Sequence, residues 1–183
     1  MPQVARNKQE VYAMFRSPIM TAINYVVDKI WNENRELVRV IVYEAYQPKE
    51  YNRTGEFRDA WVRGTTKALS ANTSRGEFKY DPNEMSVGSV DKNSSNYAQH
   101  IGVADDYRGE DARPYLADII YGATKWGGYF GDNFPKKRDA WAELNKRIGK
   151  RKMKQWMKEG LEYAGLTVQA HNVPINVTVT KEE

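Results

Sequence analysis

The sequence predicts an α+β fold, in which a long N-terminal helix packs on an antiparallel β-meander, followed by a second long helix and a C-terminal strand. Three observations predict this fold. Apolar residues recur at helical spacing over residues 18–46 and again over 136–163, and short segments of alternating polarity lie between and after these two stretches. We therefore expect residues 18–183 to form a single domain, preceded by an arm or short helix over residues 1–17.

The first long helix is predicted over Ser17–Tyr46. Ser17 suits the N-cap, and Pro18 suits the first helical position, where no amide hydrogen is needed. Pro48 ends the helix, because the residue before a proline is pushed out of helical geometry. Only Asn34 interrupts the apolar seam, which consists of Met20, Ile23, Val27, Ile30, Leu37 and Ile41. This seam is the face that we expect to lie on the sheet.

Two segments near this helix leave alternatives open. The β-branched second half, Leu37–Tyr46, also fits a buried strand, since a short apolar run does not distinguish a helix from a buried strand. Asn7 and Glu10 have the spacing of a capping box, which predicts a short helix over about residues 8–16. The same segment also fits a mobile terminal arm.

Three short strands are expected in the middle of the chain, over residues 62–71, 77–81 and 85–90, with a turn at Asn72–Gly76. The clearest strand is at the C-terminal end, over 175–180. Its alternate residues Ile175, Val177 and Val179 share one face. This strand must pair with the meander or with another subunit.

The second long helix is predicted over residues 136–163. One apolar stripe is formed by Trp141, Leu144 and Ile148, and another by Met153, Trp156, Met157 and Leu161. The five-residue step between the stripes contains Gly149, which predicts a kink or break there. Gly165 suits the C-terminal cap.

An aromatic, glycine-rich insert lies at about residues 122–135. It contains Trp126, Tyr129, Phe130 and Phe134. Such a segment is too apolar to remain unpaired in water as a long loop, and exposed apolar patches usually mark contacts. We therefore predict oligomer or partner contacts at these four residues, at Phe15 in the N-terminal arm, and at Ile175, Val177 and Val179 on the edge of the last strand.

The residues give no support for an enzyme, a cofactor or a metal site. The chain of 183 residues has no cysteine, which excludes disulfides, thiolate metal sites and a cysteine nucleophile. The two histidines, His100 and His171, have no metal-ligand spacing beside them. No stretch of about 18 uncharged apolar residues exists, so we expect no membrane span and no membrane partner.

The positive charge is concentrated in one segment. The net charge is +4, but ten Lys and Arg residues lie between Lys136 and Lys158 against Asp139 and Glu143, a local +8. This basic helix over 136–158 could neutralise several phosphates, with Trp156 stacking on bases. The candidate contacts to DNA or to an acidic partner are Lys146, Arg147, Lys150, Arg151 and Lys154. The alternative to phosphate binding is a solvated helix face or an acidic partner protein, which the spread of the charges around the helix favours.

The segment Tyr51-x-Arg-Thr-Gly-x-Phe-x-x-Ala-Trp61 follows the first predicted long helix. It resembles the Thr-Gly-x-Leu segment that follows the long first helix in a family of structural proteins from tailed bacteriophages, the tail-completion or head–tail neck proteins. The family pattern continues through strands to a Tyr-Ala-x-x-(apolar)-Glu-x-Gly motif, and then to an Arg-Pro-Phe-Leu-like motif that opens a second helix.

The later motifs fit in two registers. In one, they are Tyr97–Gly102 and Arg113-Pro-Tyr-Leu116. In the other, which the sequence favours, they are Ile119–Thr124 and Phe134-Pro135, so that the basic helix is the second helix. The preferred register places Ile120 where the family has glutamate.

The resemblance covers roughly residues 18–165 and implies a virion protein of the neck or upper tail. It implies a homo-oligomeric ring that contacts the head connector or adaptor and the tail tube or tail terminator protein, with contact to packaged DNA as a further expectation. The protein would be found in the virion, and in the host cytoplasm during assembly. From the residues alone, the rival function is nucleic-acid binding through the basic helix.

Overall fold

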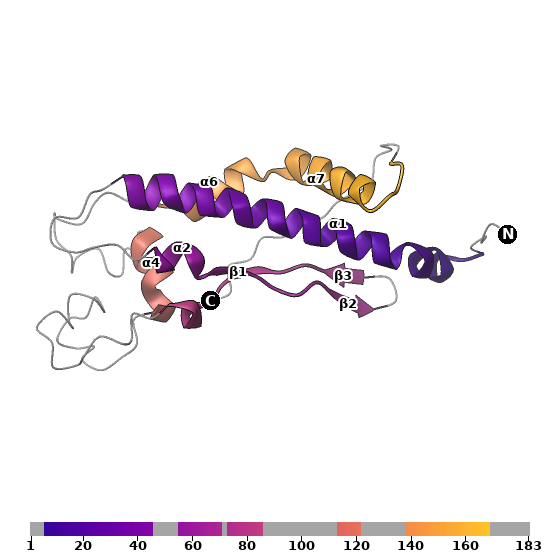
Figure 1. Ribbon diagram of the computed structural model, residues 1–183, viewed down its shortest axis with the longest axis horizontal. Coiled ribbons are helices and arrows are strands. Elements are labelled where there is room, and N and C mark those ends of the chain that lie inside the picture. The colour runs from indigo at the N-terminus through magenta and orange to yellow at the C-terminus, as the bar shows by residue number, and fades with distance from the viewer. Residues whose placement is uncertain (1–5, 46–54, 71–72, 86–112, 122–137, 169–183) are drawn as a thin grey trace, which may run out of the picture. The chain divides into compact units, whose positions relative to one another are not determined.

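The computed structural model describes residues 6–45, 55–70, 73–85, 113–121 and 138–168, and over these residues the protein has the predicted α+β fold (Figure 1). In chain order the elements are α1 (Lys8–Leu37), the π-helix η1 (Val38–Glu44), α2 (Glu56–Asp59), β1 (Trp61–Arg63), β2 (Lys67–Ser70), β3 (Thr73–Arg75), β4 (Phe78–Tyr80), the 3-10 turns η2 (Pro82–Glu84) and η5 (Arg113–Tyr115), α4 (Leu116–Tyr121), α6 (Ala140–Arg147) and α7 (Lys150–Tyr163).

Contacts divide the chain into two compact units. The first unit contains residues 1–32, 63–78 and 145–183, and the second contains residues 33–62 and 79–144. Each unit has buried apolar residues of its own, such as Ala22 and Val26 in the first and Leu37 and Leu144 in the second.

A capping box starts α1, as the sequence predicts. The Asn7 side-chain oxygen accepts a hydrogen bond from the Glu10 backbone amide (2.9 Å). The Glu10 carboxylate accepts from the Asn7 side-chain amide (3.0 Å) and from the Arg6 backbone amide (2.6 Å). These bonds satisfy amide groups that have no partner inside the first turn of a helix.

The helix then continues through Pro18, so the predicted start at Ser17 is wrong. A proline inside a helix costs about 3 kcal/mol, because it removes an amide donor and crowds the preceding turn. The turns before the proline are held by the capping box and by a hydrogen bond between the hydroxyl groups of Tyr12 in α1 and Ser74 in β3. A contact distant in sequence therefore extends a helix that local propensity would end.

The second half of the predicted helix is helical, which excludes the alternative of a strand at Leu37–Tyr46 for its described residues. From Val38 it continues as the π-helix η1, with Val38 and Val42 buried. The buried guanidinium of Arg138 donates a hydrogen bond to the Val42 carbonyl oxygen (3.1 Å). Asn34, which interrupts the apolar seam, is also fully buried, and its side-chain amide has no hydrogen-bond partner among the described residues.

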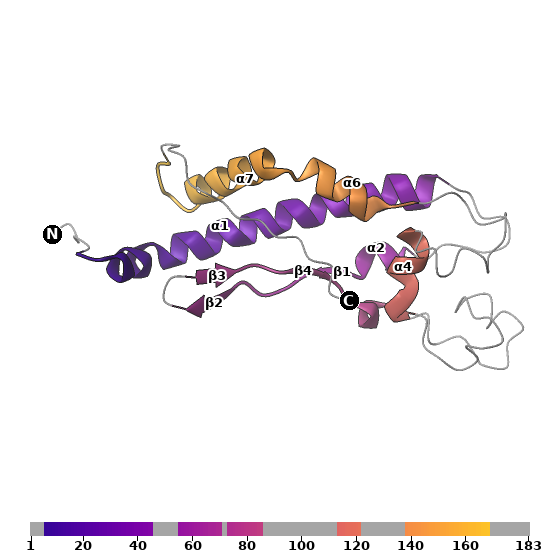
Figure 2. The ribbon, with the colours of Figure 1, turned by 180° about the vertical axis from the view of Figure 1, so that it is seen from behind.

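In the first unit, α7 and the β2–β3 hairpin lie on opposite sides of α1 (Figures 1 and 2). On one side, Gly160 of α7 touches the backbone of Ala22, since a Cβ added to Gly160 would lie 2.8 Å from the Ala22 Cα and 2.9 Å from its carbonyl oxygen. The Tyr25 hydroxyl also donates to the Glu159 carboxylate (3.2 Å). On the other side, a Cβ at Gly76 would lie 2.5 Å from the Ile23 Cγ2.

The hairpin is antiparallel and irregular. β2 pairs with β3 in the register Lys67 with Arg75, Ala68 with Ser74 and Ser70 with Thr73, with an irregularity after Ala68. The predicted turn at Asn72–Gly76 is therefore wrong, because residues 73–75 are a strand. Gly76 is not a turn residue, and its missing side chain instead allows close approach to α1.

β1 and β4 form a second pair. The Gly64 amide donates to the Glu77 carbonyl (2.9 Å) and the Asp81 amide to the Ala60 carbonyl (2.8 Å), so these segments run in opposite directions. The strand predicted at 85–90, apart from Met85, and the strand at 175–180 lie outside the described residues.

The second predicted long helix is two helices, α6 and α7, separated at Ile148 and Gly149, which confirms the predicted break. Gly165 ends α7 with φ +86°. The Gly165 amide donates to the Glu162 carbonyl (2.9 Å) and the Leu166 amide to the Leu161 carbonyl (3.0 Å), which is the Schellman motif expected of a glycine cap.

An aromatic cluster forms the core of the second unit. Trp61 of β1 lies at its centre, with ring centroids 5.3 Å from Tyr80 of β4, 5.3 Å from Trp141 of α6, 6.0 Å from Tyr121 of α4 and 6.3 Å from Phe57 of α2. Five elements are thus joined through large apolar rings, each of which buries a substantial area.

Polar contacts connect the edge of this cluster to η5. The Tyr80 hydroxyl donates to the Arg113 carbonyl (2.7 Å), and the Arg113 guanidinium donates to the Met85 carbonyl (2.9 Å). Arg113 therefore holds the start of α4 in place through both its backbone and its side chain.

The substitution Tyr121→Phe is expected to keep or slightly raise stability at neutral pH. The Tyr121 hydroxyl is buried and has no hydrogen-bond partner among the described residues, so its removal costs nothing. Burial, reinforced by the nearby Asp139, raises the pKa of Tyr121 well above its ordinary value. Below about pH 10 the hydroxyl is protonated in the folded and unfolded states alike.

Above about pH 10 only the unfolded chain ionises Tyr121, so the folded state should lose about 1.4 kcal/mol of stability per pH unit through this group. Tyr121→Phe should remove that loss, measured by urea unfolding at neutral pH and at about pH 11. Tyr163→Phe is the matched control, because Tyr163 is 76% exposed. Equal alkaline losses in wild type and Tyr121→Phe would contradict the prediction.

Candidate functional site

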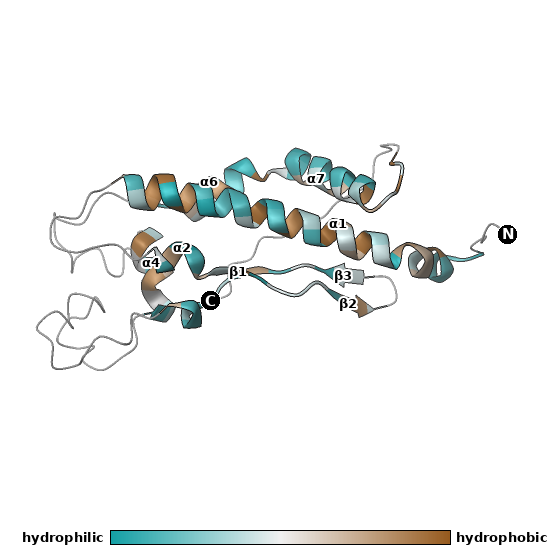
Figure 3. Ribbon diagram, in the orientation of Figure 1, coloured by the Kyte–Doolittle hydropathy of each residue, from teal (hydrophilic) through white to brown (hydrophobic). Residues whose placement is uncertain are grey.

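The basic residues predicted as contacts gather where α6 ends and α7 begins. Six of the nine residues from 146 to 154 are Lys or Arg, and none is acidic. The five exposed cations of this segment are called the basic junction: Lys146, Arg147, Lys150, Arg151 and Lys154. All five residues that the sequence proposed for DNA or an acidic partner are therefore exposed. In Figure 3, α7 is largely hydrophilic.

The cations of α7 lie mainly on one face of the helix. Trp156 and Gly160 are buried and mark the face toward α1. Lys150, Lys154 and Lys158 are exposed and follow one another at four-residue steps, which places them in a stripe along the opposite face. The interpretation that the charges spread around the helix is therefore wrong for the exposed cations of α7.

Two of the residues considered for nucleic-acid binding are not accessible. Trp156 is only 7% exposed, and the Lys152 ammonium lies over its ring at 4.9 Å from the centroid, so it cannot stack on a base. Arg138 is buried and donates to the Val42 carbonyl. Lys136 and Lys137 lie outside the described residues.

The charge at the start of α7 opposes the stability of the helix. Gly149 is the N-cap and makes no side-chain capping bond, and the first turn holds no acidic residue. The amide groups there already carry partial positive charge, so each cation in this turn costs about 0.3–1 kcal/mol. An anion bound here would offset both effects.

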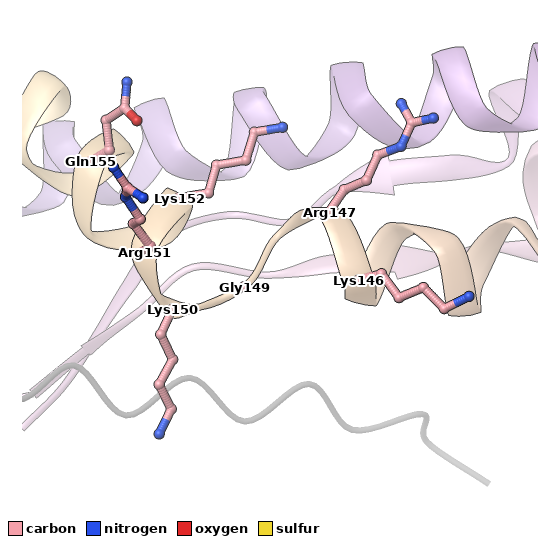
Figure 4. Close-up of a pocket in the computed structure, with 7 residues that line it drawn as sticks. All are labelled: Lys146, Arg147, Gly149, Lys150, Arg151, Lys152 and Gln155. Atoms are coloured by element: carbon pink, nitrogen blue, oxygen red, sulfur yellow. The ribbon is translucent and has the colours of Figure 1, made fainter.

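Four residues of the basic junction, Lys146, Arg147, Lys150 and Arg151, line an open depression of about 480 Å³ (Figure 4). Its lining also includes Gly149, Lys152 and Gln155. Figure 4 shows that the side chains do not converge on one point, because Arg147 and Lys150 extend to opposite sides of the link between α6 and α7. The depression is therefore an extended cationic surface and not a compact site for one small anion.

A second surface feature lies on the first turns of α1. Val11, Met14 and Phe15 are 43%, 39% and 38% exposed, and their three- and four-residue spacing places them on one helical face. Phe15 is the one predicted contact residue of the apolar set that the structure describes. The others lie outside the described residues: Trp126, Tyr129, Phe130, Phe134, Ile175, Val177 and Val179.

Sequence reasoning missed three further exposed large apolar residues, of which Tyr163 at the end of α7 is 76% exposed. Leu69 of β2 is 60% exposed and Val40 of η1 is 41% exposed. Leu69 stands among small and polar residues, a pattern that could have indicated an outward position. Val40 lies within an apolar run in which no local signal distinguishes it from the buried Val38 and Val42.

Arg113–Leu116, one of the segments in the family resemblance, opens a helix. Residues 113–115 form η5, which leads directly into α4. This is the geometry that the first register requires. In the other register, the first motif includes Ile119 and Ile120, which lie within α4, and the second helix is the basic helix.

Within the described ranges, no group of three or more His, Cys, Asp or Glu residues is placed to hold a metal ion. Among the same residues, no helix combines the length and apolarity that a membrane crossing requires. Comparison with models of protein families, with curated proteins and with solved structures found no match for this chain.

Proposed function

We propose that this protein is a structural component of a tailed-bacteriophage particle that assembles as a homo-oligomeric ring in the neck or upper tail. It would act there by shape and self-association and not as an enzyme. Its neighbours would be the head connector or adaptor on one side and the tail tube or tail terminator protein on the other. It would pass through the host cytoplasm during assembly.

The order and roles of the motif-bearing elements support this proposal. The segment that resembles the family's Thr-Gly-x-Leu pattern follows the long first helix, as in that family. Gly55 has φ +84° and starts α2, a backbone conformation that favours glycine. Phe57 and Trp61 of the same segment enter the aromatic cluster, and antiparallel strands follow them in the chain.

The observation that carries the ring proposal is the exposed apolar face of Val11, Met14 and Phe15. A helix face of this kind gains free energy when a partner removes it from water. In a ring, each copy would present this face to a different surface of its neighbour. Repetition around the axis then makes modest contacts strong in combination.

The double variant Val11→Ser/Phe15→Ser should remain folded but fail to assemble. Electron microscopy and light scattering of the purified wild-type protein should show closed rings, and those of the variant should show monomers. Circular dichroism should be unchanged, because both side chains are exposed. The matched control is Val40→Ser/Leu69→Ser, which removes two exposed apolar residues elsewhere and should leave the rings intact.

A monomeric wild type at every concentration, or rings formed equally well by the Val11/Phe15 variant, would contradict this assembly surface. The proposed location of the protein in the particle is tested by a separate measurement. In particles that incorporate a tagged copy of the chain, gold label should lie at the head–tail junction, and label along the capsid shell or tail shaft would contradict the proposed location.

A further inference from the structure

We propose that the basic junction binds the phosphate backbone of duplex DNA without reading its sequence. This proposal does not depend on ring assembly, since it concerns exposed cations of α6 and α7 and not the apolar face of α1. Its first support is charge: the five residues Lys146, Arg147, Lys150, Arg151 and Lys154 are exposed, and no acidic residue lies between them in the sequence.

The arrangement of these cations suits a linear polyanion. Lys150, Lys154 and Lys158 are separated by steps of about 6 Å along the axis of α7. Lys158 forms an ion pair with Glu162, at 3.6 Å, so it is not counted in the basic junction. Because Arg147 and Lys150 extend to opposite sides of the link (Figure 4), the surface offers charge over a length and not at one point.

The one tryptophan of the segment 146–158 is not available to read bases by stacking. Trp156 is buried under Lys152, so base stacking on it is excluded. Arginine or lysine contacts to phosphates position a protein on DNA but carry no sequence information. The expected mode is therefore electrostatic, sequence-independent binding.

The surface also differs from a protein interface. Protein interfaces generally have an apolar core within a polar rim. Among the described residues, the exposed large apolar side chains are on α1, η1, β2 and the end of α7, and none belongs to residues 146–158. Charge without an apolar core fits a phosphate backbone better than it fits an acidic protein.

The test is fluorescence anisotropy of a labelled duplex of arbitrary sequence, titrated with the full-length protein over a range of salt. Five phosphate contacts predict a slope of about −4.5 for log K against log salt, or a loss of about 500-fold in affinity between about 50 and 200 mM salt. The triple variant Lys150→Gln/Arg151→Gln/Lys154→Gln should reduce the slope to about −1.8, a loss of about 12-fold over the same range.

The control variant Lys8→Gln/Arg16→Gln/Lys67→Gln removes the same charge from other exposed positions and should keep the wild-type slope. Both variants should keep the wild-type circular dichroism spectrum. The junction variant should be no less stable than wild type, because it removes cations from the positive end of a helix.

Three outcomes would overturn the proposal: no duplex binding at low salt, equal slopes for the junction and control variants, or binding to polyglutamate but not to DNA. A strong preference for one duplex sequence would also contradict a backbone-only mode. Ring formation by the junction variant, measured in parallel, separates a failure of this proposal from a failure of the assembly proposal.

Discussion

Trp61→Ala should lower the free energy of unfolding by about 3–5 kcal/mol, the usual range for removing a large buried aromatic side chain. Trp61 is 5% exposed, and its ring lies within 5.3–6.3 Å, centroid to centroid, of four other aromatic rings. The substitution would leave a cavity where α2, β1, β4, α4 and α6 meet. Neighbouring rings cannot fill it without leaving their own contacts.

The measurement is urea unfolding followed by circular dichroism. Trp31→Ala is the matched control, since Trp31 is only partly buried and its ring faces the Arg63 guanidinium at 4.6 Å. Trp31→Ala should lower the free energy of unfolding clearly less than Trp61→Ala. A partly exposed ring buries less apolar area, and its removal leaves no closed cavity. Equal losses for the two tryptophans would show that the cluster is not the core of the second unit.

Gly160→Leu should lower the free energy of unfolding by about 3 kcal/mol, at the upper end of the range for overpacking. Helix propensity alone predicts the opposite sign, because leucine is favoured over glycine by nearly 1 kcal/mol inside a helix. The contact with Ala22 decides the result. A Cβ at position 160 would lie 2.8 Å from a backbone atom of α1, and backbone cannot move aside as a flexible side chain can.

Gly149→Ala is the control for this prediction. Gly149 is the N-cap of α7, and a Cβ there would meet no atom closer than the Lys146 carbonyl oxygen at 4.0 Å. Its cost should stay within about 1 kcal/mol, because alanine is a poorer N-cap than glycine but meets no close neighbour here. A neutral or stabilising Gly160→Leu would show that α7 does not pack closely on α1.

The two large effects concern different units, because Trp61 belongs to the second unit and Gly160 to the first. If the units unfold in separate transitions, each substitution should shift only the transition of its own unit. One shared transition, shifted by both substitutions, would indicate that the chain unfolds as a single cooperative body.

The sequence by itself determined the features that depend on residues within a few positions of one another. The Asn7–Glu10 cap, the break at Gly149 and the glycine cap at Gly165 were all predicted, because each is a short-range hydrogen-bond or backbone preference. The α+β class was predicted for a similar reason, since helical and strand periodicities are local patterns. The five cations of the basic junction were also identified from the sequence.

Only the tertiary structure decided which residues are covered and by what. α1 continues through Pro18 where the sequence alone predicted a start, and Tyr12 in its first turns bonds to Ser74, more than sixty residues away. Gly76 and Gly160 look like a turn residue and a weak helix position, yet each serves as a point of close contact with α1. Their roles depend on distant neighbours that no local pattern specifies.

The same limit applies to the candidate site. Counting charges could not show that Arg138 and Trp156 are buried while Lys150, Arg151 and Lys154 are exposed. Burial depends on what packs against a residue, so it is settled when α7 places Gly160 against Ala22. That single close contact fixes which face of α7 is turned to solvent, and with it the cations that a polyanion can reach.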